Sequence, residues 1–198
     1  MVVVLSLEQA ESGLLEGVMR CPRCQGRLRP YGHARTRTVR GLGSARLRVT
    51  PRRARCADCQ ATHVLLPGQL LVRRADATEV IGHALTAKAV SGAGHRSIAA
   101  RLGRPVSTVR RWLRRATEPH VEWLCREAEQ RCARIDRELL DTSPSAPLSA
   151  PLTTLAWALD RLARAALRYR ERFGVTDSVW ALIGAFSCGR LLAPPMIT

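Results

Sequence analysis

Two cysteine pairs constrain the fold of this chain more than any other feature of its sequence. Cys21 and Cys24 form one C-x2-C pair, Cys56 and Cys59 form another, and residues 25–55 lie between the pairs. Each pair offers two thiolates about one turn apart, and an intervening strand pair would bring the four into a tetrahedron. The pattern predicts a small four-cysteine zinc ribbon, although its spacer is longer than the roughly 15–20 residues that are common. Because four thiolates leave no open position for water, we expect one structural Zn²⁺.

Two other interpretations of the cysteines have less chemical support. A lone C-P-x-C is also typical of thiol redox proteins, but Cys21 and Cys24 lack the βαβ context of such proteins. Disulfides are disfavoured because the start of the chain lacks a basic signal-peptide region, which indicates a cytoplasmic protein with reduced thiols. His33 and His63 are interpreted as surface or supporting residues. The remaining cysteines are interpreted as packing residues: Cys125, Cys132 and Cys188.

Positive charge is concentrated in the first part of the chain. The 198 residues include 32 Lys and Arg against 16 Asp and Glu, which gives a net charge of +16. Residues 118–198 hold equal numbers of each sign, so the whole excess lies in residues 1–117. A regional excess of this kind indicates a surface for a polyanion such as nucleic acid. A merely solvated basic surface is the alternative.

The order of patterns along the chain predicts an α+β fold that is mostly α. Ser6 and Gln9 resemble a capping box that opens a short helix. A Gly-Leu-Gly turn at 41–43 separates two strand-like runs, and a third strand is expected at 62–66. The expected parts are an N-terminal helical segment (1–19), the zinc ribbon (20–68), a helix-turn-helix domain (75–117) and C-terminal helices forming a hairpin or bundle (118–192), with a Pro/Ser linker at 141–151.

The segment from Gly94 to Arg115, G-H-R-S-I-A-A-R-L-G-R-P-V-S-T-V-R-R-W-L-R-R, has the pattern of a helix-turn-helix. One short helix ends at Gly103 and the next begins near Pro105, with its apolar stripe turned inward. Residues 80–117 contain no acid, which suits a helix that approaches phosphates. We expect base contacts from Ser107, Thr108 and Arg111 and phosphate contacts largely from Arg104, Arg110, Arg114 and Arg115. A plain three-helix bundle with a basic face is the alternative.

Apolar residues recur with heptad-like spacing in two stretches of the last third of the chain. One stretch runs over 121–139 and the other over 152–173. Homodimerisation through residues 120–173 would explain both seams, and so would the pairing of two helices within one chain. Residues 175–192 are predicted to form a final, mostly apolar helix.

The quoted helix-turn-helix segment, together with C-P-R-C-Q-G and C-A-D-C-Q-A-T, resembles an uncharacterised family from high-GC Gram-positive bacteria. Members of that family tend to lie beside transposase and integrase genes. The order of zinc ribbon and helix-turn-helix is similar to the N-terminal DNA-binding region of insertion-sequence transposases. The resemblance implies double-stranded DNA as a partner, together with a transposase or integrase encoded nearby. The resemblance covers about residues 15–117. We expect no RNase H-like catalytic domain of the transposase type, because the chain has no room for one.

These patterns lead us to expect a non-enzymatic, sequence-specific DNA-binding protein that serves a mobile element as an accessory or regulatory factor. The sequence contains no G-x-S-x-G, P-loop or H-E-x-x-H motif. The alternatives are a transcriptional regulator unrelated to transposition, a redox protein that uses Cys21 and Cys24, an RNA-binding protein, or a remnant of an element. No segment reaches the roughly 18 apolar residues of a membrane helix. We therefore expect a cytoplasmic, nucleoid-associated location without a membrane partner.

Overall fold

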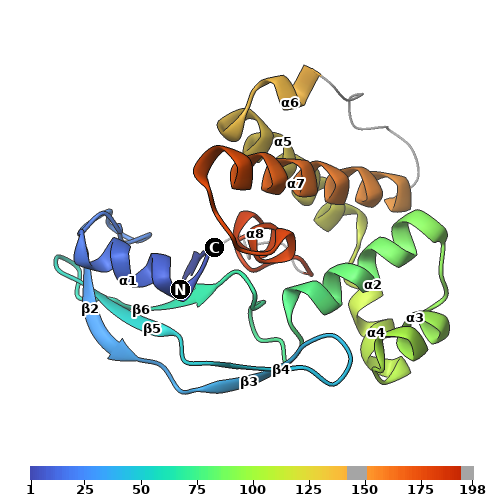
Figure 1. Cartoon of the computed structure of the whole chain (residues 1–198), viewed down its shortest axis with the longest axis horizontal. Helices are drawn as coiled ribbons and strands as arrows, with labels where there is room; N and C mark the ends of the chain where they lie inside the picture. Colours follow the sequence, from blue (N-terminus) through green and yellow to red (C-terminus); the bar gives the residue numbers. More distant parts are fainter. Residues whose placement is uncertain (142–150, 193–198) are drawn as a thin grey trace.

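The structure of the chain is a computed structural model that describes residues 1–141 and 151–192 (Figure 1). Within these residues the fold is α+β, with eight helices, a four-stranded sheet of order β1-β6-β5-β2 and a two-stranded sheet of β3 and β4. In chain order the elements are β1 (Val2–Val4), α1 (Leu7–Leu15), β2 (Leu28–His33), β3 (Arg37–Arg40), β4 (Arg46–Val49), β5 (Arg52–Cys56), β6 (Thr62–Pro67), α2 (Thr78–Ser91), α3 (His95–Leu102), α4 (Val106–Leu113), α5 (Glu118–Ile135), α6 (Glu138–Asp141), α7 (Pro151–Phe173) and α8 (Val179–Phe186).

The residues between the two cysteine pairs form one long antiparallel ribbon. Strand β2 pairs with β5, and β3, which follows β2, pairs with β4, which precedes β5. The two strand pairs are therefore successive halves of one ribbon. Between the halves, the Ala34 N–H donates to the Pro51 carbonyl at 2.8 Å. The ribbon runs from the region of α1 to the region of α3 and α4 (Figure 1). A long hairpin therefore fills the unusually long spacer, and the predicted Gly-rich turn and third strand are confirmed.

The first residues of the chain form a strand of the sheet and are followed by a short helix. Strand β1 pairs in parallel with β6, with Val3 opposite Leu66. Three consecutive valines favour a strand because their branched side chains fit a pleated surface. Helix α1 then places Ala10 and Leu14 in a small core against the ribbon. Helix α1 lies within the predicted N-terminal helical segment (1–19), and this segment covers the apolar side of the ribbon.

Helices α2, α3 and α4 occupy the positions predicted for three helices, to within a few residues. Gly92 and Gly103 end the first two of them with φ values of 62° and 61°, the left-handed conformation that glycine adopts without strain. Ile98, Val109 and Trp112 are buried between the helices.

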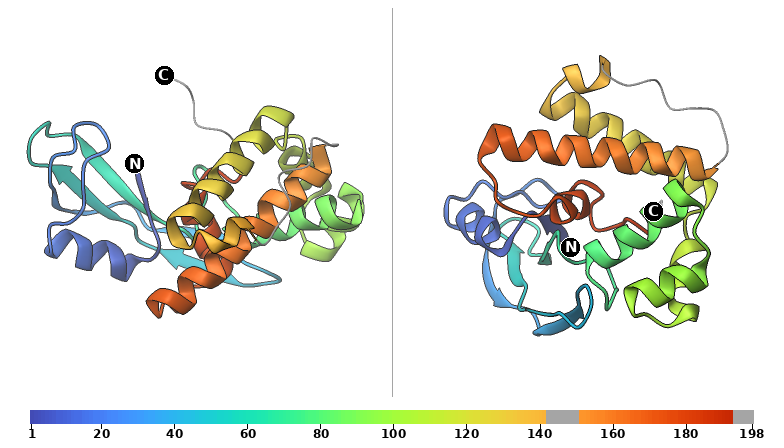
Figure 2. Two further views of the ribbon diagram at one scale, coloured as in Figure 1. Left: turned by 90° about the horizontal axis from the view of Figure 1, so that it is seen from above. Right: turned by 45° about the vertical axis from the view of Figure 1, so that its right-hand side comes forward.

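Helices α5 and α7 pack against each other along the two predicted seams (Figure 2). Pairing within one chain therefore accounts for both seams, and homodimerisation stays a prediction. The Pro/Ser linker and Leu152 fall largely outside the residues and side chains that the structure describes. No helix in the described ranges has the length and apolar character needed to cross a membrane. The buried seam residues are Val121, Cys125, Ala128, Cys132, Ile135, Leu155, Leu159, Leu162 and Ala166.

The final helix is shorter than the predicted span of 175–192. Helix α8 begins where the Ser178 hydroxyl accepts from the Ala181 N–H at 3.1 Å, and it ends at Phe186. Cys188 and Gly189 then take φ values of 51° and 68° and reverse the chain. The reversal leaves Cys188 exposed, contrary to the expectation that it packs.

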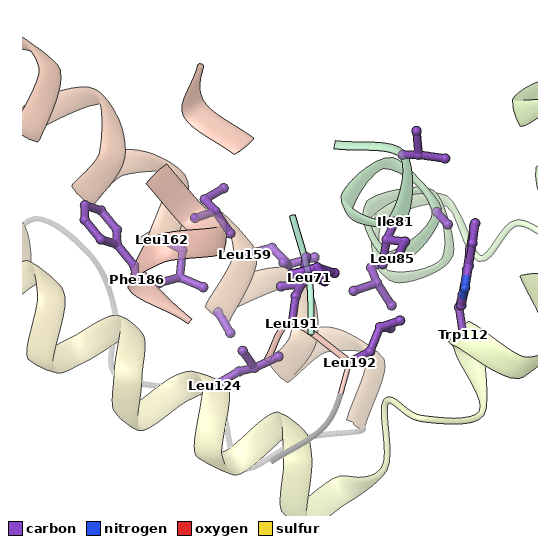
Figure 3. Packing of buried hydrophobic residues seen from close by; sticks show 14 of the residues in the cluster. Leu71, Ile81, Leu85, Trp112, Leu124, Leu159, Leu162, Phe186, Leu191 and Leu192 are labelled. Atoms are coloured by element: carbon purple, nitrogen blue, oxygen red, sulfur yellow. The ribbon is translucent and has the colours of Figure 1, made fainter. Parts of the chain in front are cut away.

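One continuous core joins the end of the ribbon to the later helices, and Leu139 and Leu140 of α6 pack against its edge. It contains Val39 and Val49 of the ribbon together with buried residues from α2 to α5, α7 and α8. Figure 3 shows part of this core, where Leu85 of α2, Leu124 of α5 and Leu162 of α7 lie. Gly68, which follows β6, lies so close to the backbone of α8 at Gly184 that neither glycine could carry a side chain without displacing the other chain segment. The predicted division between 75–117 and 118–192 therefore does not separate two cores.

Candidate metal centre and basic helix surface

The four paired cysteines converge at one end of the ribbon. Their sulfur atoms all lie within 4.8 Å of one another. The Sγ atoms of Cys24 and Cys56 are 3.4 Å apart, and those of Cys21 and Cys59 are 3.7 Å apart. A disulfide needs about 2.05 Å. A tetrahedral Zn²⁺ with Zn–S bonds of about 2.3 Å sets its sulfurs about 3.8 Å apart, so the four thiols fit such an ion.

The backbone repeats the same turn at both cysteine pairs. The Cys21 N–H donates to the carbonyl of Gly26 at 2.8 Å, and the Cys56 N–H donates to the carbonyl of Ala61 at 2.9 Å. The residue after each second cysteine is a glutamine in the left-handed region, Gln25 with φ 62° and Gln60 with φ 59°. Two equivalent turns at the tips of paired strands aim four sulfurs at one point. The repeated C-x2-C-Q in the sequence is the signal that could have predicted this symmetry.

Gly26 has a different role from the one suggested by its place after the first cysteine pair. The left-handed residue of that turn is Gln25, so the turn does not depend on glycine at position 26. A side chain at Gly26 would instead strike the carboxylate of Asp58 and approach the Cys56 sulfur. Gly26 therefore lets the two cysteine turns approach each other closely.

His63 lies beside the cluster as a buried supporting residue, whereas His33 is exposed. The His63 Nε2 atom is 3.3 Å from the Cys21 sulfur. Such a contact orients a thiolate without completing the ligand set, because four sulfurs are already present.

The clustered thiols do not release their protons equally. Burial raises the pKa of Cys21, but hydrogen bonds from two backbone N–H groups and from His63 outweigh it and lower that pKa to about 6. At Cys24 the backbone N–H of Gly26 lowers the pKa, but contacts with neighbouring thiols and burial raise it to about 12. Like charges crowded together oppose the ionisation of the last thiol. A bound divalent cation would remove that opposition, because a coordinated thiol loses its proton.

The outer face of α4 brings together most of the residues predicted to contact DNA. Five exposed residues line one open hollow on this helix. Thr108 lies on the same helix, is half-buried and does not line the hollow. Among the described residues, the arginines of this hollow form no ion pair with any acid. The lining residues are Ser107, Arg110, Arg111, Arg114 and Arg115.

Arg104 does not belong to that exposed surface, contrary to the expectation that it contacts phosphate. Its side chain is 4% exposed, and its Nε donates to Asp76 Oδ1 at 2.7 Å. The rest of the guanidinium donates to backbone carbonyls, including that of Gly41 in the ribbon turn. Arg104 therefore holds the turn between α3 and α4 against the ribbon.

Asp76 holds this part of the fold together, and sequence reasoning missed it. Its buried carboxylate receives Arg104 on one oxygen and Arg40 of β3 on the other, each at 2.7 Å. It precedes α2 and thus joins three parts of the fold. The sequence does distinguish Asp76 from its neighbours, because it is the one acid between Asp58 and Glu79.

Arg74 extends the basic surface beyond α4. Burial lowers the pKa of this half-buried side chain, and the positive charges of Arg115 and Arg111 lower it further. The positive charges of Arg111 and Arg115 therefore act on Arg74 from a second segment of the chain. A bound polyanion would relieve that repulsion.

Residues 21–112 match a family model described as "Domain of unknown function (DUF6431)". The match begins at the first cysteine of the cluster and ends at Trp112 in α4, so it includes the ribbon, Asp76 and most of the basic surface. Helices α5 to α8 lie outside it. No curated protein and no solved structure matches the chain.

Proposed function

We propose that this chain binds double-stranded DNA through the outer face of α4. In this proposal α2, α3 and α4 form a helix-turn-helix, and α4 is its recognition helix. The observation that carries the proposal is the hollow on α4, where four arginines and a serine are exposed together without an acidic partner among the described residues. A helix that enters the major groove must offer hydrogen-bond donors and keep carboxylates away from phosphates.

The roles within α4 follow from position. Ser107 and Thr108 lie in the first turn of α4, which reaches base edges when a recognition helix enters the groove. Arg111 lies four residues after Ser107, on the same face of the helix. Arg114 and Arg115 lie at its end and suit phosphates. Arg110 contacts His95 at the start of α3, with 3.1 Å between Nη2 and Nε2. This position suits a contact with the DNA phosphate backbone beside the groove.

We further propose that the cysteine cluster holds one structural Zn²⁺ and makes the N-terminal unit a zinc ribbon. Cys21, Cys24, Cys56 and Cys59 would be its ligands, and the ion would supply a cross-link between the two turns. A redox role for Cys21 and Cys24 has less support. Cys21 contacts Cys59 and Cys24 contacts Cys56, so each of these sulfurs also faces the other pair, which a two-cysteine redox site does not require.

In the cell, we propose a non-catalytic accessory or regulatory role in the movement of a mobile element, with a transposase or integrase as partner. This part rests on the resemblance of the cysteine and helix motifs to transposase DNA-binding regions. Regulation of transcription unrelated to transposition is the second candidate, since a basic recognition helix serves both.

The decisive experiment measures DNA binding by the full-length, zinc-loaded chain at several salt concentrations. We expect duplex DNA to bind with a steep salt dependence. The variant Arg111→Gln/Arg115→Gln should lose about tenfold or more in affinity, because each arginine contributes either a base contact or a phosphate contact. It should stay folded, because the change removes repulsion with Arg74.

The matched control is Arg126→Gln/Arg134→Gln on α5, which removes the same charge from exposed positions away from α4. It should bind nearly as well as the unchanged chain. An unchanged chain that ignores duplex DNA at low salt would contradict the proposal. Preference for RNA in direct competition would shift it to the RNA-binding alternative.

A further inference from the structure

We propose that the β3–β4 end of the ribbon is a second DNA-binding element, which lies against the phosphate backbone next to the groove that α4 enters. This inference rests on the proposed function and names a further part of the same surface. Its residues are Arg46 and Arg48, neither of which belongs to the helix-turn-helix.

The β3–β4 hairpin has one apolar and one polar face. Val39 and Val49 are buried in the main core and fix the inner face. On the opposite face, Thr38 pairs with Arg48 and Arg40 pairs with Arg46. Residues 17–57 contain no acid, so the charged side chains that the hairpin itself places on this face are all positive.

The charge on the outer face is only partly neutralised by the protein. Like charges directly opposite each other destabilise a strand pair. Arg40 pairs with Asp76, which it shares with Arg104. Arg46 bonds to the turn carbonyls of Ser44 and Ala45 at 3.2 Å, which carry no full charge. Arg46 and Arg48 are exposed and form no ion pair within the described ranges. Two guanidinium groups are thus left to bind an anion.

The hairpin is held firmly beside the recognition helix. Arg40 donates its N–H to the Ala75 carbonyl and accepts from the Ala77 N–H, each at 2.9 Å. Arg104 reaches from the turn before α4 to the carbonyl of Gly41. The hairpin turn lies next to α3 and α4 in both figures of the whole chain (Figures 1 and 2). Since these contacts are numerous and partly buried, the two elements present one rigid surface.

Arg74 connects the two basic areas along this surface. It is next to Ala75, which bonds to the hairpin, and its pKa is lowered by burial and by Arg115 and Arg111 of α4. Arg74 therefore lies in the segment that joins the hairpin backbone at Arg40 to the neighbourhood of the basic end of α4. A helix in the major groove has a phosphate strand on each side of it, and an attached basic element can follow one of them.

The chemistry of the hairpin favours phosphates of duplex DNA over unpaired bases. Proteins that bind single strands stack bases on aromatic side chains. Residues 34–50 contain no aromatic residue, so the hairpin offers arginine donors without a stacking surface. The contact should therefore add affinity and salt dependence without adding sequence preference.

The test compares Arg46→Gln/Arg48→Gln with the control Arg126→Gln/Arg134→Gln in the full-length, zinc-loaded chain. The slope of log affinity against log salt should fall by up to about 1.8 in the hairpin variant, because each phosphate contact contributes about 0.9. On duplexes of about one and about two helical turns, the unchanged chain should prefer the longer one, and the hairpin variant should lose that preference. Arg46→Lys/Arg48→Lys should restore most of the slope, since the positive charge is kept.

The outcomes separate this inference from the proposed function. If the hairpin variant keeps the slope and length preference of the control while Arg111→Gln/Arg115→Gln loses affinity, α4 binds DNA alone and the inference is overturned. If the unchanged chain binds no duplex, the proposed function fails and the inference fails with it. Circular dichroism of each variant checks that a lost slope does not come from unfolding, because both exposed positions can change without opening the core.

Discussion

At the scale of single residues, Asp76 and Arg104 show what a local pattern can and cannot indicate. The sequence places Arg104 beside a helix start in a basic, acid-free segment, which predicts an exposed phosphate contact. The side chain is instead buried against Asp76, 28 residues earlier in the chain. The sequence around Arg104 gives the charge of this residue. It does not show that Asp76, which is distant in the sequence, lies beside it in the fold. The α4 arginines were predictable because their exposure follows from helix periodicity alone.

Removing the Asp76 carboxylate should destabilise the fold strongly. Asp76→Ala leaves Arg104 buried and Arg40 without its ion-pair partner, so the free energy of unfolding should fall by about 3–5 kcal/mol. Urea denaturation measures the change. Asp160→Ala is the control, because its pair with Arg164 is exposed on both sides and should contribute about 0.3–0.5 kcal/mol. Equal losses in the two variants would refute the role given to Asp76.

At the scale of elements, the ribbon was predictable where its signals are local. Cysteine spacing and the turn glycines predict the two cysteine turns and the β3–β4 hairpin. The pairing of β1 with β6 was not predictable, because Val3 and Leu66 are far apart in sequence and nothing local indicates their register. The same limit applies to α8, where the apolar run continues but Cys188 and Gly189 reverse the chain.

Loss of one cluster cysteine should remove the metal and loosen the ribbon. The small core around Cys21 and Cys56 contains few large apolar residues, so its stability should depend on a metal cross-link. We expect one zinc per chain by elemental analysis, and none in Cys56→Ser. Cys188→Ser is the control, because this cysteine is exposed and outside the cluster. A Cys56→Ser chain that retains its zinc would show that the ion, if present, is bound elsewhere.

At the scale of the whole molecule, the boundary of charge and the boundary of the core do not coincide. All of the excess positive charge lies before residue 118, which suggests a separable DNA-binding half. The buried cluster nevertheless runs from Val39 through Leu85 and Leu124 to Leu192. Charge distribution is readable from sequence because it is additive. Core boundaries are not, because they depend on which apolar faces meet.

A fragment of residues 1–117 should therefore fail to fold on its own, even with zinc. It would expose the surfaces of α2 that α7 and α8 cover. We expect the fragment to bind a hydrophobic dye and to give a poorly dispersed proton NMR spectrum, whereas the full-length chain in the same buffer unfolds in one cooperative transition. A well-dispersed spectrum of the fragment would show that the N-terminal half is an autonomous domain.

The close contact of Gly68 with α8 has a consequence for how the protein is made. During translation the ribbon and α2–α4 leave the ribosome before α8, yet their shared core is completed by residues 182–192. Until α8 has been synthesised, the nascent chain exposes an apolar surface, which is a state that chaperones recognise. The basic surface would then reach its final arrangement only after α8 has docked. A chain released before that point would carry the positive charge without the folded surface.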